Sequence, residues 1–274
     1  MNLTLKVVIL AILQGITEFL PVSSSGHLAV MGNLLVIPDS QKLLLTIVLH
    51  AGTLVAILLY YWRDLLDLLY PRLRWRIWGL GIVATIPVAL TGPFLEKWLD
   101  SIFASARMLY FAAGCGFLAS FIVLFFIFQQ QASQVTQWEQ MTWQKALLIG
   151  VAQIIAVMPG LSRSGTTIAA GTRVGCESVF ATRFSFLMAI PVLAGAVVLK
   201  LPELYRLFSS GGHAQTVPLL NPGHLLLGFG IAAIVGYLSI MVLIRMLKRR
   251  TFRFFGFYCL LMALVSIVLG FTNA

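Results

Sequence analysis

The sequence predicts an all-α polytopic membrane protein with six transmembrane helices and two re-entrant helix-loop-helix hairpins in an inverted-topology repeat. Composition, the spacing of the charges and two Pro/Gly/Ser interruptions support this prediction. Hydrophobic residues make up 59% of the 274 residues and charged residues only 10%, whereas soluble domains carry about 25% charged residues. We therefore treat 1–274 as a single integral membrane domain.

Long stretches without Asp, Glu, Lys or Arg separate the charges, and each can hold most of the roughly 20 apolar residues that cross a bilayer as a helix. The expected crossings are 43–62, 77–95, 105–128, 180–200, 224–247 and 253–272. The three cysteines share no short spacing, which indicates neither a disulfide framework nor a metal site.

Two further apolar stretches, 3–36 and 144–175, are interrupted by Pro21–His27 and by Pro159–Gly165. Proline and small polar residues break a helix at such positions. Irregular backbone at membrane depth persists only where it is buried in protein or lines a wet cavity. We therefore predict that both stretches form re-entrant hairpins.

The net charge of +10 comes from basic residues that gather in short loops, and such loops are typically cytoplasmic. Because cytoplasmic loops explain the positive charge, we do not expect nucleic acid as a partner. The pattern places 63–76, 129–145 and 248–253 in the cytoplasm, and 96–104 and 201–223 outside. Both termini then lie outside, and the two hairpins enter from opposite sides.

An internal repeat relates the two hairpins. A shift of 139 residues aligns identical residues, which are Gln14 with Gln153, Ile16 with Ile155, Ser23 with Ser162, Ser25 with Ser164, and Gly26 with Gly165. The halves 1–128 and 144–274 would each hold one hairpin and three crossings. An odd number of crossings inverts the second half, and inverted repeats place a polar site near the midplane.

Few ionisable residues lie away from the loops. Glu18, His27 and Arg163 do so among the hydroxyl groups of the two interruptions. A charge at the bilayer centre costs about 2.5–3.5 kcal/mol on insertion scales, so such residues usually mark function. His50 is interpreted as interfacial, at the outer end of a crossing. Arg183 is interpreted as an anchor at the cytoplasmic end of another.

The residue types in the interruptions point to phosphate chemistry. Arg163 offers a charged fork that matches phosphate oxygens, and Gly26 and Gly165 would let backbone N–H groups approach an anion. Ser24 could attack phosphorus, and His27 could move a proton. A ligand with several phosphate groups that binds at membrane depth implies that the substrate is a lipid phosphate.

Plainer interpretations stand beside this one. The serines could only cap helix ends, Arg163 could pair with Glu18 as a structural bridge, and His27 could cap its hairpin. A transporter or lipid flippase is the alternative of a different class, because a midplane anion site between inverted repeats also suits a carrier.

Three segments carry a family resemblance. Gln14–His27 and Pro159–Thr167 closely resemble the two signatures of the bacitracin-resistance type undecaprenyl-diphosphatases, and Arg183–Leu187 followed by Pro191 resembles a third shared stretch. Their order and separation fit along essentially the whole chain. Many members have Glu where this chain has Gln14.

The resemblance implies an integral membrane phosphatase that removes the terminal phosphate of undecaprenyl diphosphate. This reaction regenerates the lipid carrier for peptidoglycan and other envelope polymers and confers bacitracin resistance. The implied location is the outer, periplasmic face of the bacterial cytoplasmic membrane. The implied cofactor is a divalent cation, either Mg²⁺ or Ca²⁺, and a homo-oligomer is left open.

By position, the resemblance assigns catalytic roles to Glu18, Ser24, His27 and Arg163. Glu18 would also contact the cation. The remaining motif residues are assigned to substrate binding, namely Gln14, Ser23, Ser25, Gly26, Ser162, Ser164, Gly165 and Thr167. Ser24 is the first choice for the nucleophile, with attack by His27 or by activated water left open.

Overall fold

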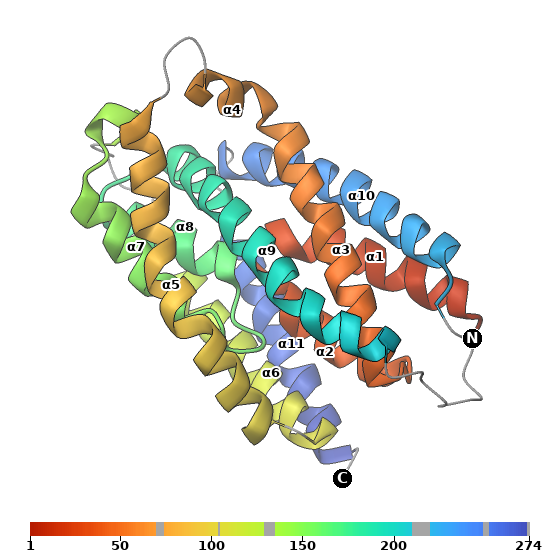
Figure 1. Cartoon of the computed structure of the whole chain (residues 1–274). Coiled ribbons are helices and arrows are strands. Elements are labelled where there is room, and N and C mark those ends of the chain that lie inside the picture. The colour runs from red at the N-terminus through yellow and green to blue at the C-terminus, as the bar shows by residue number, and fades with distance from the viewer. Residues whose placement is uncertain (70–73, 104, 129–134, 210–219, 249–251, 273–274) are drawn as a thin grey trace.

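The computed structural model describes residues 1–69, 74–103, 105–128, 135–209, 220–248 and 252–272. Across these ranges the chain forms eleven α-helices (Figure 1), with one 3₁₀ turn at Trp138–Gln140 and one π-helical turn at Val123–Ile127. The only bridge between extended segments in these ranges joins Val135 to Cys176. The predicted all-α class is confirmed.

Six helices in the described ranges are long and apolar enough to cross a membrane, as expected of a multi-pass membrane protein. They are α3 (Asp39–Tyr60), α5 (Trp75–Ile102), α6 (Ala106–Ile122), α9 (Ser178–Ser209), α10 (Pro222–Lys248) and α11 (Arg253–Thr272). Their apolar segments match the six expected crossings to within a few residues. The first crossing ends at Tyr60, and a separate short helix, α4 (Trp62–Leu69), follows it.

Four other helices form two pairs at the predicted interruptions. They are α1 (Leu3–Phe19) with α2 (Ser24–Leu34), and α7 (Trp143–Ile155) with α8 (Arg163–Arg173). The longest of them has 17 residues, fewer than the roughly 20 that a crossing needs.

The breaks are shorter than the motifs that predicted them. Helix α2 already begins at Ser24, so Gly26 and His27 are helical, and Arg163 is the first residue of α8. Ser23 and Ser162 are the reason, because a serine side chain at the N-cap accepts a backbone N–H of the first turn and starts the helix.

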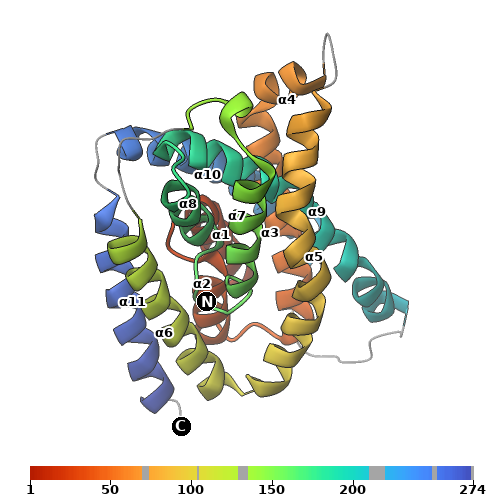
Figure 2. The same ribbon diagram turned by 90° about the vertical axis from the view of Figure 1, so that its left-hand side faces the viewer.

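The short helices lie in the middle of the molecule. Figure 2 shows α1, α2, α7 and α8 near the centre of the view, with α6 and α11 on one side and α3, α5 and α9 on the other. Helices α6 and α11 pack along each other, as do α10 with α3 and α1, and α5 with α7. The long helices therefore enclose the two turns that join the short ones.

Candidate active site

The two turns meet backbone to backbone at a pair of glycines. A Cβ on Gly26 would lie 2.7 Å from the Cα of Gly160. Gly160 has φ +87°, and its own Cβ would lie 2.2 Å from the carbonyl oxygen of Ala113. A side chain on Gly26 would force the two turns apart, and one on Gly160 would push the second turn away from α6.

A long helix from the opposite half holds each turn. On α6, the Ser120 hydroxyl donates to the Gly160 carbonyl (3.0 Å) and accepts from the Ser162 amide (2.8 Å). On α11, the Tyr258 hydroxyl lies 2.7 Å from Nε2 of His27. The neighbouring Cys259 thiol donates to the Pro21 carbonyl at 3.6 Å. Both turns are therefore fixed from outside their own hairpin.

The serines of the two turns repeat one arrangement. Ser23 accepts the Gly26 amide and Ser162 accepts the Gly165 amide, at 3.3 and 3.1 Å. Ser25 lies 3.3 Å from the Ser23 hydroxyl, and Ser164 lies 3.2 Å from that of Ser162. The cap serines thus use the Gly26 and Gly165 amides, and an anion would have to take the other N–H groups of the two first turns.

A cavity of about 150 Å³ lies where α2 and α8 begin. Its wall includes the first residues of both helices. Seven predicted site residues line it, namely Glu18, Ser23, Ser24, Ser25, Ser162, Arg163 and Ser164. The first amides of a helix have no intrahelical partner and carry its positive end. Two such ends at one cavity make it suited to an anion.

Glu18 and Arg163 pair across the contact between the hairpins. Nη2 of Arg163 donates to Oε1 of Glu18 at 2.5 Å. The Glu18 side chain is only 4% exposed and that of Arg163 17%. The guanidinium therefore uses one nitrogen on Glu18, and the buried Nη1 has no partner among the described residues.

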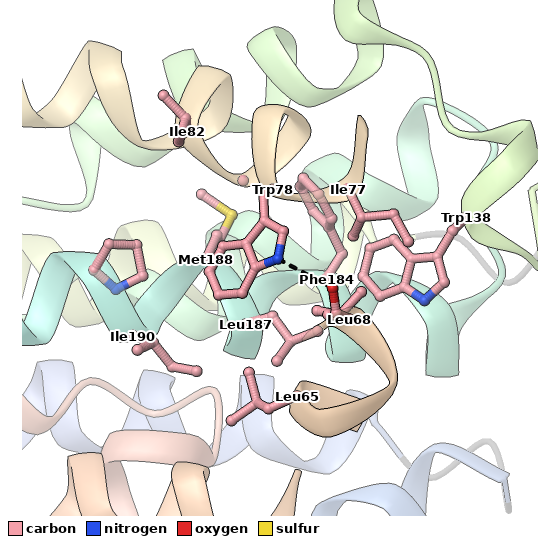
Figure 3. A pocket seen from close by; sticks show the side chains of 12 residues that line it. Leu65, Leu68, Ile77, Trp78, Ile82, Trp138, Phe184, Leu187, Met188 and Ile190 are labelled. Carbon is pink, nitrogen blue, oxygen red and sulfur yellow. Dashed lines mark hydrogen bonds between the residues drawn. The ribbon is translucent and has the colours of Figure 1, made fainter. Parts of the chain in front are cut away.

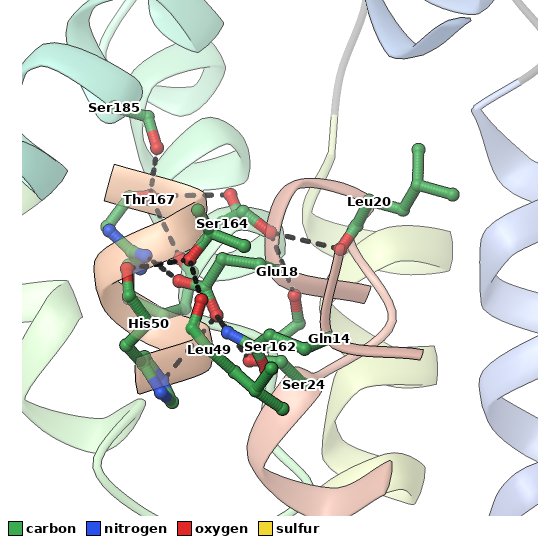
Figure 4. A network of polar contacts seen from close by, with 12 residues as sticks. Gln14, Glu18, Leu20, Ser24, Leu49, His50, Ser162, Ser164, Thr167 and Ser185 are labelled. Atoms are coloured by element: carbon green, nitrogen blue, oxygen red, sulfur yellow. Dashed lines mark hydrogen bonds and ion pairs between the residues drawn. The ribbon is translucent and has the colours of Figure 1, made fainter. Parts of the chain in front are cut away.

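The second carboxylate oxygen of Glu18 accepts two further hydrogen bonds (Figure 4). The Ser24 hydroxyl donates to Oε2 at 2.6 Å, and the Gln14 amide donates to the same oxygen at 3.1 Å. The hydrogen of the Ser24 hydroxyl therefore points at a carboxylate that can accept it.

His27 does not line the cavity. Its ring is 2% exposed and lies edge-on to Phe117 and parallel to Tyr258. Nδ1 lies 2.7 Å from the Ser23 carbonyl, and Nε2 is occupied by the Tyr258 hydroxyl. His27 stands behind the turn that carries Ser24.

The remaining predicted residues also stand behind the cavity wall. The Thr167 hydroxyl donates to the Arg163 carbonyl at 2.9 Å and lies 2.6 Å from the Ser185 hydroxyl of α9. Gln14 reaches the site through Glu18. These residues position α8 and the carboxylate.

His50, on α3, is the cavity-lining histidine that sequence reasoning missed. Its Nε2 lies 3.8 Å from Oε2 of Glu18, and the side chain is 22% exposed. The interfacial interpretation was wrong because the packing of α3 against α1 brings residues 32 positions apart together.

Gln153, on α7, was missed as well. It is buried with both side-chain polar atoms unpartnered, and it lines a neighbouring cavity together with Arg163 and His50. Its alignment with Gln14 in the internal repeat was the signal that could have identified it.

Larger cavities lie on either side of Pro191. One of about 370 Å³ adjoins the polar cavity between α5 and α9, and shares His50 and Arg163 with it. Another of about 380 Å³ lies between α4, α5 and α9 (Figure 3) and has an apolar lining that includes Trp78, Phe184 and Met188. Without acid, base or nucleophile in its wall, the latter is unsuited to catalysis.

Within the described residues, no group of three or more His, Cys, Asp or Glu side chains could hold a metal ion. The polar cavity offers one carboxylate, Glu18, and several serine hydroxyls. Mg²⁺ takes oxygen ligands and commonly combines one or two carboxylates with phosphates of the substrate. This donor set fits a cation that arrives with a phosphate ligand.

Comparison with known proteins gives a consistent result. Residues 7–265 match the family described as Bacitracin resistance protein BacA. An undecaprenyl-diphosphatase of Methanosphaera stadtmanae is 33% identical over 97% of this chain and 98% of its own length. One of Geobacter metallireducens is 35% identical over 94% of both. The chain belongs to the BacA family of bacitracin resistance proteins.

Proposed function

We propose that this protein is a membrane-embedded hydrolase that converts undecaprenyl diphosphate to undecaprenyl phosphate and inorganic phosphate. The observation that supports this most directly is the cavity where α2 and α8 begin, with the Arg163 side chain in its wall. Helix N-termini and a guanidinium nitrogen are the donors that phosphate oxygens take. The relatives named as undecaprenyl-diphosphatases support the choice of lipid.

Ser24 is the nucleophile in this proposal. Its Oγ attacks the terminal phosphorus, and its proton passes to Oε2 of Glu18, 2.6 Å away. The bond from that phosphorus to the bridging oxygen breaks, and its electron pair leaves on undecaprenyl phosphate. Arg163 and the first amides of the two helices stabilise the charge that develops on the phosphoryl oxygens. Water then releases phosphate from Ser24.

A divalent cation, Mg²⁺ or Ca²⁺, is part of the proposal. Glu18, with the serine hydroxyls, would hold it together with the diphosphate. When bound, the ion supplies positive charge that neutralises the phosphoryl oxygens. Arg163 and Glu18 cancel one another in charge, so a diphosphate in this cavity leaves negative charge for such an ion to balance.

His27 has a positioning role in the proposal. Both ring nitrogens are engaged, and the ring ties the Ser23 carbonyl to Tyr258. This contact fixes the turn that sets Ser24 against Glu18.

We further propose that α1–α2 and α7–α8 are re-entrant hairpins of an inverted repeat. The short lengths of these helices support this, and so do the serine caps that repeat in both turns. In addition, α6 of the first half binds the second turn, and α11 of the second half binds the first turn. Two hairpins entering from opposite sides would meet inside the bilayer. The cavity would then lie at membrane depth, within reach of a lipid diphosphate.

The proposed location is the bacterial cytoplasmic membrane, with the cavity open to the periplasmic side. Recycling of the lipid carrier there would support peptidoglycan synthesis, cell wall biogenesis and cell shape, and would underlie resistance to bacitracin. The flippase alternative has no support from the named relatives. A carrier would also have no use for a serine hydroxyl aimed at a buried carboxylate.

The test is phosphate release from undecaprenyl diphosphate by the purified protein in detergent, with and without EDTA. Ser24→Ala should lower the rate at least about 100-fold, since it removes the nucleophile, and EDTA should abolish release until Mg²⁺ or Ca²⁺ is restored. Ser239→Ala is the matched control, because Ser239 only donates to the Val235 carbonyl within α10. No release by folded wild-type protein with added cation would overturn the proposal.

A further inference from the structure

A second cavity continues from the polar one. It has a volume of about 370 Å³, lies between α5 and α9, and has four wall residues in common with the polar cavity, which are His50, Ala156, Arg163 and Val192. We call it the α5–α9 cavity. The polar cavity has only about 150 Å³, whereas pockets that enclose organic ligands usually have about 300–1,000 Å³. A diphosphate that carries a long hydrocarbon chain therefore needs space beyond the polar cavity.

The wall of the α5–α9 cavity is largely hydrocarbon. Most of its residues are aliphatic, glycine or proline. The Thr85 hydroxyl donates to the Gly81 carbonyl at 2.8 Å, and Glu96 pairs with Lys200 at 2.6 Å. The amide atoms of Gln153 are buried. Away from the residues that it shares with the polar cavity, the wall therefore suits a hydrocarbon chain better than a polar ligand.

The α5–α9 cavity opens on the outer surface of the helix bundle. Ala89 of α5 and both Ala196 and Leu199 of α9 belong to its wall and are exposed, Leu199 by 65%. Only 17% of the residues in the most apolar segment of α5 are buried, less than in any of the other five long helices of the described ranges. An apolar helix surface of this kind faces lipid in a membrane. The opening therefore leads from the bilayer into the protein.

We propose that the α5–α9 cavity binds the isoprene units that follow the diphosphate of the substrate. This inference rests on the proposed function. With the terminal phosphate beside Ser24, the prenyl chain passes the shared wall at Val192, lies between α5 and α9, and continues into the bilayer. Hydrocarbon gains little free energy on moving from lipid to an apolar protein surface. The cavity therefore acts mainly by giving the chain one path, which fixes the direction from which the diphosphate enters the polar cavity.

The length of the cavity sets how much of the chain it holds. Its wall on α5 runs from Thr85 to Glu96, which is about 16 Å along a helix. An extended isoprene unit adds four main-chain bonds, or about 5 Å. The cavity therefore holds about three units, and the rest of an undecaprenyl chain stays in the bilayer.

The other large cavity is a less suitable place for the chain. This apolar cavity of about 380 Å³, between α4, α5 and α9, has only Pro191 in common with the α5–α9 cavity. It has no wall residue in common with the polar cavity. A chain attached to a phosphate in the polar cavity would reach it only by passing Pro191.

Three glycines allow a matched test. A Cβ added to Gly195, Gly81 or Gly230 meets no atom within 4 Å. Gly195 lines the α5–α9 cavity, Gly81 lines the apolar cavity, and Gly230 of α10 lines neither of them nor the polar cavity. Leucine favours a helix more than glycine does. The three leucine variants should therefore fold and differ in which cavity the new side chain enters.

Purified wild type and the three variants are compared on methyl, farnesyl and undecaprenyl diphosphate at one detergent concentration, with melting temperature as the measure of folding. Gly195→Leu should lower kcat/KM at least about 10-fold for farnesyl and undecaprenyl diphosphate, because the leucine blocks the path of the chain. For methyl diphosphate, which has no such chain, kcat/KM should stay within about 2-fold of wild type. Gly81→Leu and Gly230→Leu should match wild type on all three substrates.

Photolabelling locates the chain without turnover. Wild type is irradiated with a farnesyl diphosphate analogue that carries a diazirine on its second isoprene unit, and the labelled peptides are identified by mass spectrometry. We expect labels within 85–96 of α5 and 191–199 of α9, and we expect undecaprenyl phosphate to compete with them. Gly195→Leu should lose this labelling, and Gly81→Leu should keep it.

Several results would overturn the inference. Gly195→Leu could keep wild-type kinetics on undecaprenyl diphosphate, or slow methyl diphosphate equally. Gly81→Leu could instead be the variant that slows the two prenyl substrates, or the labels could fall outside the two segments. The labelling of wild type decides the matter where Gly195→Leu fails to fold. A wild type that is labelled at this cavity but releases no phosphate would contradict the proposed function alone, so the two failures are distinguishable.

Discussion

Arg163 donates to Glu18 across 145 positions of sequence, and the contact joins the first residue of α8 to the end of α1. The same pair holds the two hairpins together and supplies the charges of the candidate site. A single buried contact therefore serves both the fold and the proposed chemistry, and mutations there affect both.

Replacing one partner of this ion pair should lower the free energy of unfolding more than replacing both partners. Arg163→Met leaves a buried carboxylate without its cation, for which about 3–5 kcal/mol of unfolding free energy is expected. Adding Glu18→Gln removes that charge and should restore part of the loss. Unfolding in mixed micelles by a denaturing detergent measures the free energies. Strictly additive losses in the double variant would show that the pair does not couple the hairpins.

The contact between the second turn and α6 should not tolerate a methyl group. Gly160→Ala places a Cβ against the Ala113 carbonyl at positive φ, so we expect a loss of about 1–3 kcal/mol and reduced phosphate release. Gly81→Ala is the matched control, since no atom lies within 4 Å of its added Cβ. It should be neutral or slightly stabilising, as alanine favours a helix by about 1 kcal/mol. Equal effects of the two variants would contradict close contact of the second turn with α6.

Single cysteines should show the orientation of the chain. Arg74→Cys, at the start of α5, should react with an impermeant maleimide only in inside-out vesicles. Lys97→Cys, near the other end of that helix, should react in intact spheroplasts. Both starting residues are exposed. The reverse labelling pattern would invert the proposed topology and place the cavity on the cytoplasmic side.

Cys176, between α8 and α9, should be unreactive in the folded protein. Burial raises the pKa of its thiol to about 11, so the thiol remains protonated at pH 8, and the thiolate is the reactive form. Alkylation in a Cys115→Ser, Cys259→Ser background should be slow at pH 8 and fast after unfolding. The folded state holds this proton more tightly, so stability should fall as pH rises from 9 towards 11. Rapid native alkylation at pH 8 would contradict this.

Much of the architecture followed from where charges and prolines stand. Long charge-free stretches identified the six long helices, and Pro21 and Pro159 identified the two breaks. The Ser24, Glu18 and Arg163 cluster could be predicted because its members occupy two short motifs whose tips were expected to meet.

Tertiary contacts limited the rest of the prediction. His27 is next to the serines in sequence, but its place in the first turn of α2 directs it to α6 and α11. His50 is far away in sequence and reaches Glu18 only because α3 packs beside α1. The Ser23 and Ser162 side chains accept the Gly26 and Gly165 amides, which the sequence alone did not indicate. Nearness along the chain was a poor guide to which polar atoms remain free.

The hold of Tyr258 and Cys259 on the first turn has a consequence for synthesis. The turn is made early, whereas α11 is the last of the described helices to leave the ribosome. Until α11 inserts, Ser24 lacks the support that sets it against Glu18. A nascent chain that ends before residue 253 should therefore be unable to process lipid, and catalytic competence arrives only with the last helix.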